Sequence, residues 1–198
     1  MTTFPAIPNV ELLSLQEAAL WLFEWFVEKA IREAGGPNRG PWPDYFNGRV
    51  GLPVPRDLNA PGYPWCTSSA YCIFDEAARQ KRVINPFPKT AKAVGVTNLA
   101  DAITRVSNPR PGSIIILDHG SAWKKEMAAG ARLTDPGHCM IVNRTVTGDL
   151  SGNTNGAGSR EGDRFAEKLW PDGGDASAVH GGIVVSIHDF DLAPVRPA

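Results

Sequence analysis

The chain has 198 residues, of which 42% are hydrophobic and 21% charged, as is ordinary for one globular domain with a sizeable core. Lys and Arg total 20 against 21 Asp and Glu, so the net charge of −1 excludes the basic field that draws in nucleic acid. Residues 1–10 lack signal-peptide character, and charges interrupt the apolar segment 12–31. We therefore expect a protein made in the cytoplasm without a signal peptide and without membrane insertion.

The first predicted element is an amphipathic helix after Ser14. Ser14 followed by Glu17 is a capping-box pattern, and apolar residues recur at helical spacing from Leu15 to Ile31. Gly35-Gly36-Pro37 ends this pattern. We expect this helix to be buried against a sheet rather than to bind a partner, and we expect residues 35–64, rich in Gly and Pro, to form an ordered loop.

Helical spacing returns at residues 67–81 and, more weakly, at residues 88–94. The later part of the chain instead has short apolar segments typical of strands, at residues 113–117, 138–143 and 183–188. Helices followed by short strands predict an α+β domain, with N-terminal helices packed on an antiparallel sheet.

The three cysteines, Cys66, Cys72 and Cys139, leave at least one thiol unpaired and do not describe a disulfide scaffold. Cys66 stands where a turn becomes a helix, and a helix N-terminus favours the nucleophilic thiolate and offers N–H groups to an oxyanion. Most cysteines are instead small buried hydrophobic residues, which is the interpretation we give to Cys72. Cys66 is thus the candidate nucleophile.

His138 is the candidate base, because it opens a predicted strand directly after a loop. His119, which also ends a strand, is its main rival, and His180 and His188 are weaker candidates. A third polar group must orient such an imidazole. Asn153 suits this role, with Asp149 and Ser151 on the same strand face, although this segment taken alone is better explained as a plain turn.

Several short segments in this order resemble the CHAP family of cysteine- and histidine-dependent amidohydrolases/peptidases. They are Tyr63-Pro-Trp-Cys-Thr67, Phe74–Ala78, Arg110–Ser113, Gly137-His138 and Gly152–Asn155, with weaker similarity at residues 36–40 and 158–162. The resemblance covers about residues 11–190. It implies one papain-like catalytic domain over residues 1–198, without a separate wall-binding domain.

The resemblance further implies hydrolysis of peptidoglycan amide bonds. In that reaction Cys66 forms a thioester, His138 transfers the proton, and Tyr63, Trp65 and Thr67 line the substrate cleft. The enzyme would act on the cell wall, in phage lysis or as a secreted effector, and an immunity or targeting protein would be a further partner. The alternative is a catalytically weak CHAP-like module that binds wall peptides.

Ser151 departs from the family, because many CHAP sequences have glutamate at this position to orient the histidine. Three options follow: Asn153 orients His138, Asp149 does so from a shifted strand, or the enzyme is impaired. We favour the first. Residues 120–136 are interpreted as a solvated loop, with a substrate-side lid as the alternative.

A metal site is the remaining alternative. Zinc ligands are nominally available in His119, His138 and Cys139, but adjacent strand residues point to opposite faces, so His138 and Cys139 are unsuited to one ion. The sequence has no CxxC or HExxH motif and no acidic calcium loop. We therefore expect neither a metal nor another cofactor.

Overall fold

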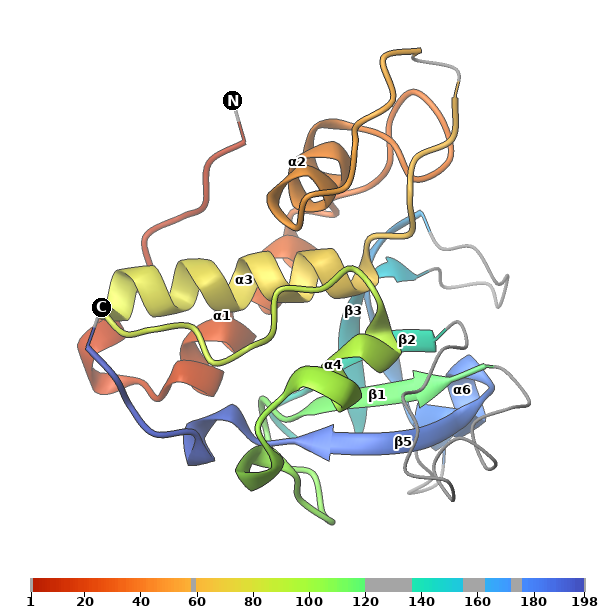
Figure 1. Ribbon diagram of the computed structural model, residues 1–198. Helices are drawn as coiled ribbons and strands as arrows, with labels where there is room; N and C mark the ends of the chain where they lie inside the picture. Colours follow the sequence, from red (N-terminus) through yellow and green to blue (C-terminus); the bar gives the residue numbers. More distant parts are fainter. Residues whose placement is uncertain (1, 58–59, 120–136, 155–162, 172–175, 198) are drawn as a thin grey trace.

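The computed structural model describes residues 2–57, 60–119, 137–154, 163–171 and 176–197, excluding the side chains of residues 153, 154 and 178 (Figure 1). Within these residues the helices are α1 (Leu15–Glu28), α2 (Pro41–Arg49), α3 (Cys66–Lys81), α4 (Ala93–Leu99) and α6 (Ala176–His180). The strands are β1 (Ile114–Asp118), β2 (Gly137–Val142), β3 (Gly148–Thr154), β4 (Arg164–Leu169) and β5 (Ile183–His188). The predicted α+β class is confirmed.

The strands form one antiparallel sheet in the order β4-β3-β2-β1-β5. Ile116 on β1 pairs with Cys139 on β2, and Ile141 on β2 pairs with Leu150 on β3. Because side chains alternate along a strand, the two faces of the sheet carry different residues. Ile116, Cys139, Ile141 and Leu150 belong to the large core, whereas Leu117, Met140 and Val142 form a smaller apolar cluster on the other face.

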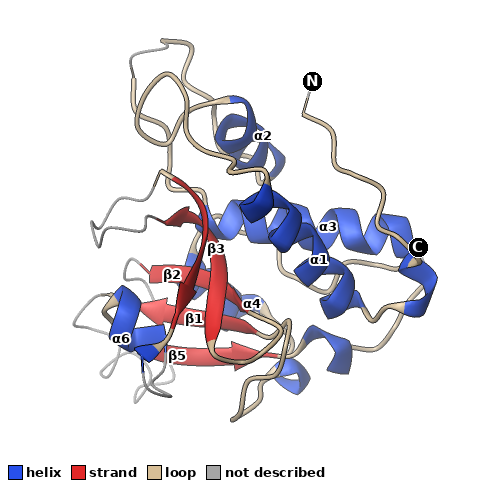
Figure 2. Cartoon of the chain, turned by 180° about the vertical axis from the view of Figure 1, so that it is seen from behind, coloured by secondary structure: helices blue, strands red, loops and turns tan. Residues whose placement is uncertain are grey.

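Helices cover the two faces unequally (Figure 2). Residues of α1, α3 and α4 supply most of the large core, whereas α6 contributes Ala176 to the smaller cluster. Phe26 of α1 joins the layers, since its ring stacks on Phe165 of β4 at 4.7 Å and meets Phe46 of α2 edge-on at 5.7 Å. We name the face covered by α1, α3 and α4 the inner face and the other the outer face.

Helix α1 begins as the sequence predicts. Ser14 Oγ accepts from the Glu17 N–H at 3.2 Å, and Glu17 Oε2 accepts from the Ser14 N–H at 2.7 Å, which completes the capping box. The helix ends at Glu28, before the Gly-Gly-Pro segment, because Ala30 has a left-handed φ of 49°.

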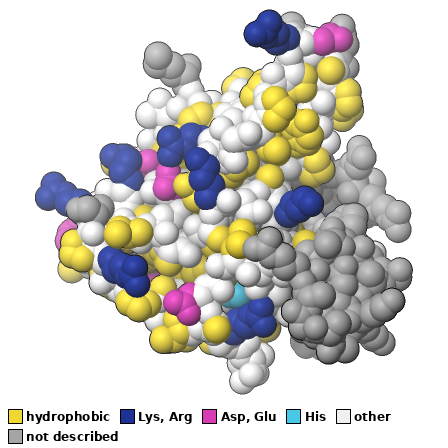
Figure 3. Space-filling model, in the orientation of Figure 1, with side chains coloured by type: hydrophobic (Ala, Val, Ile, Leu, Met, Phe, Trp, Pro, Cys, Tyr) yellow, Lys and Arg dark blue, Asp and Glu magenta, His cyan; other side chains and the backbone are white. Residues whose placement is uncertain are grey.

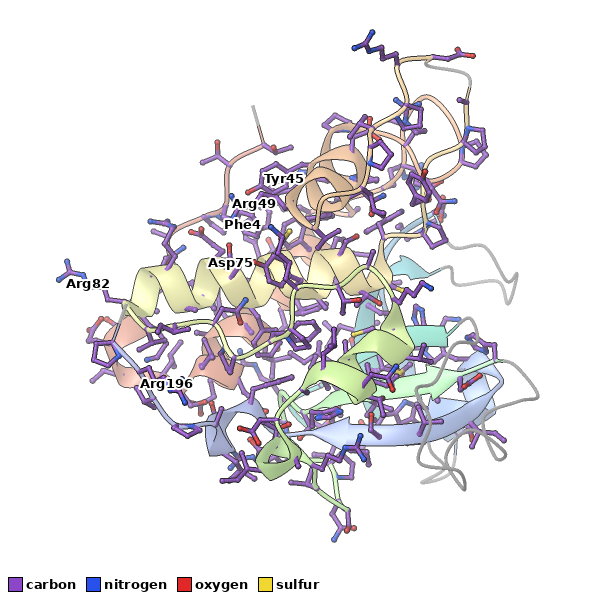
Figure 4. All side chains as sticks on the ribbon, viewed as in Figure 1. Phe4, Tyr45, Arg49, Asp75, Arg82 and Arg196 are labelled. Carbon is purple, nitrogen blue, oxygen red and sulfur yellow. The ribbon has the colours of Figure 1, made fainter. Side chains whose placement is uncertain are left out.

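The prediction of a loop throughout residues 35–64 is wrong, because α2 lies inside this range. Pro41 occupies the first turn of α2, where a missing N–H costs nothing. Arg49 of α2 donates to Asp75 of α3 at 2.5 Å, and Figure 4 shows the two side chains facing each other beside Tyr45. The loop itself is organised by Arg39, whose buried guanidinium bonds Asp44 and three backbone carbonyls.

One other predicted element changes in position, and two elements are new. The weak helix predicted at residues 88–94 is α4, which starts later, at Ala93. Strand β4 and helix α6 were not predicted. The segment 120–136, interpreted as a loop or lid, and the weak similarity at residues 158–162 lie outside the described residues.

None of the described helices is long and apolar enough to cross a membrane. On the face shown in Figure 3, the visible Lys and Arg side chains are spread over several elements rather than gathered in one patch.

Candidate active site

Cys66 is the first residue of α3, so the predicted helix start is confirmed. The preceding loop is fixed by Asn47 of α2, whose Nδ2 donates to the Tyr63 carbonyl at 2.8 Å and whose Oδ1 accepts from Ser68 Oγ at 2.7 Å. Ser69 Oγ donates to the Cys66 carbonyl at 2.8 Å. Side chains of two helices therefore determine where the thiol stands.

The Cys66 side chain is buried rather than presented to solvent. Its Sγ lies 3.7 Å from Thr67 Oγ1. Burial raises the pKa of the Cys66 thiol, and the nearby Thr67 hydroxyl and the backbone of Cys139 offset only part of the rise. The helix N-terminus favours a thiolate, but burial has the larger effect here, so the resting group is a neutral thiol.

His138 is the second residue of β2 and only 9% exposed. Its Nε2 lies 3.0 Å from Ser151 Oγ on β3. Burial lowers the pKa of His138 well below its usual value, and His180, His119 and Lys168 lower this pKa further when they carry positive charge. The imidazole is therefore neutral near pH 7, which is the form that a general base requires.

Cys66 lies beside the segment of β2 that contains His138. The backbone of Cys139, the residue directly after His138, lies near enough to the Cys66 thiol to lower its pKa. Cys139 belongs to the inner core, so its neighbour His138 points to the outer side of the strand. Among the described residues, no hydrogen bond joins Cys66 Sγ to the His138 ring. Their catalytic pairing thus stays a prediction.

The side chain that orients the His138 imidazole can be assigned in part. Ser151 contacts the imidazole, whereas Asp149 bonds His180 and Trp170 instead, so the option in which Asp149 itself holds His138 is wrong for this structure. Asn153 lies on β3, but its side chain is outside the described residues, and its predicted orienting role stays a prediction.

The residues predicted to line the cleft differ in exposure. Trp65 and Thr67 are fully buried, whereas Tyr63 is 42% exposed. Trp65 packs against Phe165 of β4, with ring centroids 5.2 Å apart, and its Nε1 donates to Glu33 at 2.9 Å. Only Tyr63 has the exposure that the wall of an open cleft needs, so the prediction for Trp65 and Thr67 is corrected: they support the nucleophile from within.

A second polar constellation, missed by the sequence prediction, adjoins His138. Asp149 is fully buried, and its carboxylate accepts from His180 Nε2 at 2.9 Å and from Trp170 Nε1 at 2.8 Å. The His180 ring lies against the His138 ring, with centroids 4.9 Å apart. The only sequence signal was that Asp149 shares a strand face with Ser151; nothing local connects it with His180.

The remaining candidates have other surroundings. Cys72 is buried, as predicted, and burial raises its pKa to about 12. All three cysteines are free thiols. His188 lies in the core near Thr104, and His119 is exposed after β1.

A cavity of about 450 Å³ lies at the other end of α3 from Cys66, lined by Leu13, Lys81, Ile84 and Phe190 among others. Within the part of the chain that the structure describes, no three His, Cys, Asp or Glu side chains are placed to hold a metal ion.

No protein-family model matches the chain, and no curated protein or solved structure matches it. Membership of the CHAP family is therefore a proposal that depends on the residues themselves.

Proposed function

We propose that this protein is a papain-like cysteine hydrolase of the CHAP type that cleaves amide bonds in bacterial peptidoglycan. The observation that carries the proposal is the position of Cys66. Its thiol stands at the first residue of a helix, near the β2 backbone next to His138, whose Nε2 lies 3.0 Å from Ser151 Oγ. A thiol at a helix start, near an imidazole on a strand, is the arrangement that nucleophilic catalysis by cysteine uses.

The hydrogen bond to Ser151 decides which imidazole nitrogen serves as the base. When Nε2 carries the proton and donates it to Ser151 Oγ, Nδ1 is left as the acceptor for the thiol proton. Cys66 Sγ then attacks the amide carbonyl as Nδ1 takes the proton. The tetrahedral intermediate collapses to a thioester, and His138 returns the proton to the leaving amine. Water, deprotonated by the same nitrogen, releases the acid and restores the thiol.

Peptidoglycan as substrate is supported by the resemblance of the segments around Cys66 and His138 to CHAP sequences. The antiparallel sheet with the nucleophile helix on its inner face supports the papain-like assignment. Tyr63, exposed three residues before Cys66, is the described side chain best placed to contact a peptide stem.

The test is digestion of purified peptidoglycan, followed by turbidity and by mass spectrometry of the released fragments. We expect Cys66→Ala to abolish release. Cys72→Ala is the matched control, because it removes another buried thiol from the same helix and should leave most activity. Thiol alkylation should inactivate the protein, whereas EDTA should not. Full activity of Cys66→Ala would refute the proposal, and loss in EDTA that zinc restores would favour a metalloamidase.

The buried, neutral thiol without a hydrogen bond to His138 favours a second candidate, a catalytically weak module that binds wall peptides. Co-sedimentation with insoluble peptidoglycan distinguishes the two. Binding by both wild type and Cys66→Ala, with no fragments released by either, would establish the module and exclude the enzyme.

A further inference from the structure

A second histidine ring, which the proposed mechanism does not use, lies beside His138. His180, the last residue of α6, lies with its ring centroid 4.9 Å from that of His138, at an interplanar angle of 32°. Its side chain is 5% exposed. A buried flat ring at this distance restricts the orientations that the His138 ring can adopt.

A buried carboxylate holds His180 in place. Asp149 Oδ1 lies 2.9 Å and Oδ2 3.1 Å from His180 Nε2, and Trp170 Nε1 donates to Oδ2 at 2.8 Å. An ionised carboxylate only accepts, so Nε2 of His180 is the donor. Because a buried carboxylate is costly without partners, Asp149 holds the Nε2 side of the His180 ring in place.

The backbone supports this unit from both sides of α6. Ala176, at the start of α6, is fully buried in the outer cluster with Met140 and Val142. After His180, Gly181 and Gly182 have φ values of 69° and 84°, which turn the chain directly into β5. The His180 ring is therefore anchored between the sheet and a tight turn.

We propose that His180, held by Asp149, is a positioning residue for His138. Its ring keeps the His138 imidazole in the plane in which Nε2 meets Ser151, which leaves Nδ1 for the thiol. The catalytic meaning of this inference rests on the proposed function, whereas the effect on the His138 ring does not. Asp149 thus acts on His138 through His180 rather than by direct contact.

The titratable groups around His138 come from four parts of the fold. They are His180 on α6, His119 after β1, Lys168 on β4 and, behind His180, Asp149 on β3. Burial has the largest effect on the pKa of His138 and lowers it, and His180, His119 and Lys168 act in the same direction when they carry positive charge. Removal of the His180 ring exposes His138 to water and removes a group that lowers its pKa, so the pKa of His138 should rise.

Three variants separate the effects. His180→Gln removes the ring but keeps an amide N–H for Asp149, so the carboxylate stays paired. Asp149→Asn removes the charge that anchors His180 with almost no change in shape. Trp170→Phe is the matched control, because it removes the other donor to Asp149 and leaves the two histidine rings in place.

The measurement is a pH titration of the histidine ring nitrogens by NMR, together with the pH profile of kcat/KM for peptidoglycan fragments. In wild type, His138 should be neutral near pH 7 with its proton on Nε2. In His180→Gln the pKa of His138 should rise by about one unit, and both tautomers should appear. The acidic limb of kcat/KM should move with it. Trp170→Phe should titrate like wild type.

The outcomes distinguish this inference from the proposed function. A His138 pKa and tautomer in His180→Gln equal to those of wild type would overturn the positioning role, even in an active enzyme. If His180→Gln does not fold, the tautomer mixture in Asp149→Asn decides, and a single wild-type tautomer there would overturn the proposal. If His180→Gln changes the pKa and tautomer of His138 while the wild-type protein releases no fragments, the positioning role is supported and the hydrolase is refuted.

Discussion

His188 should make the fold sensitive to mild acid. The residue is fully buried on β5, where Nδ1 lies 2.8 Å from Thr104 Oγ1 and Nε2 lies 2.9 Å from Ser186 Oγ. Burial, followed by the charge of Arg105, lowers the pKa of His188 from 6.5 to about 4. The folded protein therefore binds this proton more weakly than the unfolded chain does.

The sign and size of the effect follow from that difference. The stabilisation is complete above the unfolded pKa of 6.5 and is lost as the pH falls towards the folded pKa of about 4. Linkage between these two values gives a loss of about 2.5 kcal/mol between pH 7.5 and pH 4.5. This is a large part of the 5–15 kcal/mol that roughly describes a typical domain.

Urea unfolding at pH 7.5 and pH 4.5 measures this loss for wild type and for His188→Gln. The glutamine does not titrate, so its free energy of unfolding should fall by about 2.5 kcal/mol less over the interval than that of wild type. Carboxylates and His138 titrate in both proteins, and their contributions cancel in the comparison. An equal pH dependence in the two proteins would show that His188 is not the buried neutral group described above.

Two further perturbations test how α1 and β3 are held. Ser14→Ala removes the side-chain acceptor of the capping box and should lower the free energy of unfolding by about 1 kcal/mol in a thermal or urea titration; no change would mean that the cap contributes nothing. Gly152→Ala would place a Cβ 2.5 Å from Trp65 Cζ3 and 2.7 Å from Ser69 Oγ, so it should cost about 1–3 kcal/mol and disturb the indole fluorescence. A wild-type spectrum and stability for Gly152→Ala would contradict the close packing of β3 on α3.

The elements predicted correctly are those whose signals are local. The capping box and apolar spacing of α1 lie within one segment, as do the continuous apolar residues of β1. Helix α2 escaped because its prolines and glycine were interpreted as loop residues, although Pro41 stands at the one helical position where proline is favoured. Strand β4 escaped because it is an edge strand with Phe165 as its fully buried side chain, which leaves little apolar pattern.

The site shows the same division. Strand parity places Ser151 and Asp149 on one face, and the contacts of both with the two-histidine pair agree with that face. The His180–Asp149 hydrogen bond joins residues 31 positions apart. Their elements come together only in the folded sheet, so no local sequence pattern predicts this bond. The burial of Cys66 is also a tertiary effect: the helix start is visible in the sequence, whereas the packing of α3 on β2 is not.

The serine at position 151 can be understood from its neighbour on the same strand. Asp149 is already a buried carboxylate on this face, and residues two apart on a strand stand about 7 Å from each other. A glutamate at 151 would bring a second negative charge into the same poorly solvated region, where like charges destabilise each other strongly. Ser151 avoids this repulsion and still fixes His138 Nε2, while the one carboxylate acts on the site through His180. Ser151 and the Asp149–His180 pair together hold the neutral His138 imidazole. They take the place of a carboxylate in direct contact with it.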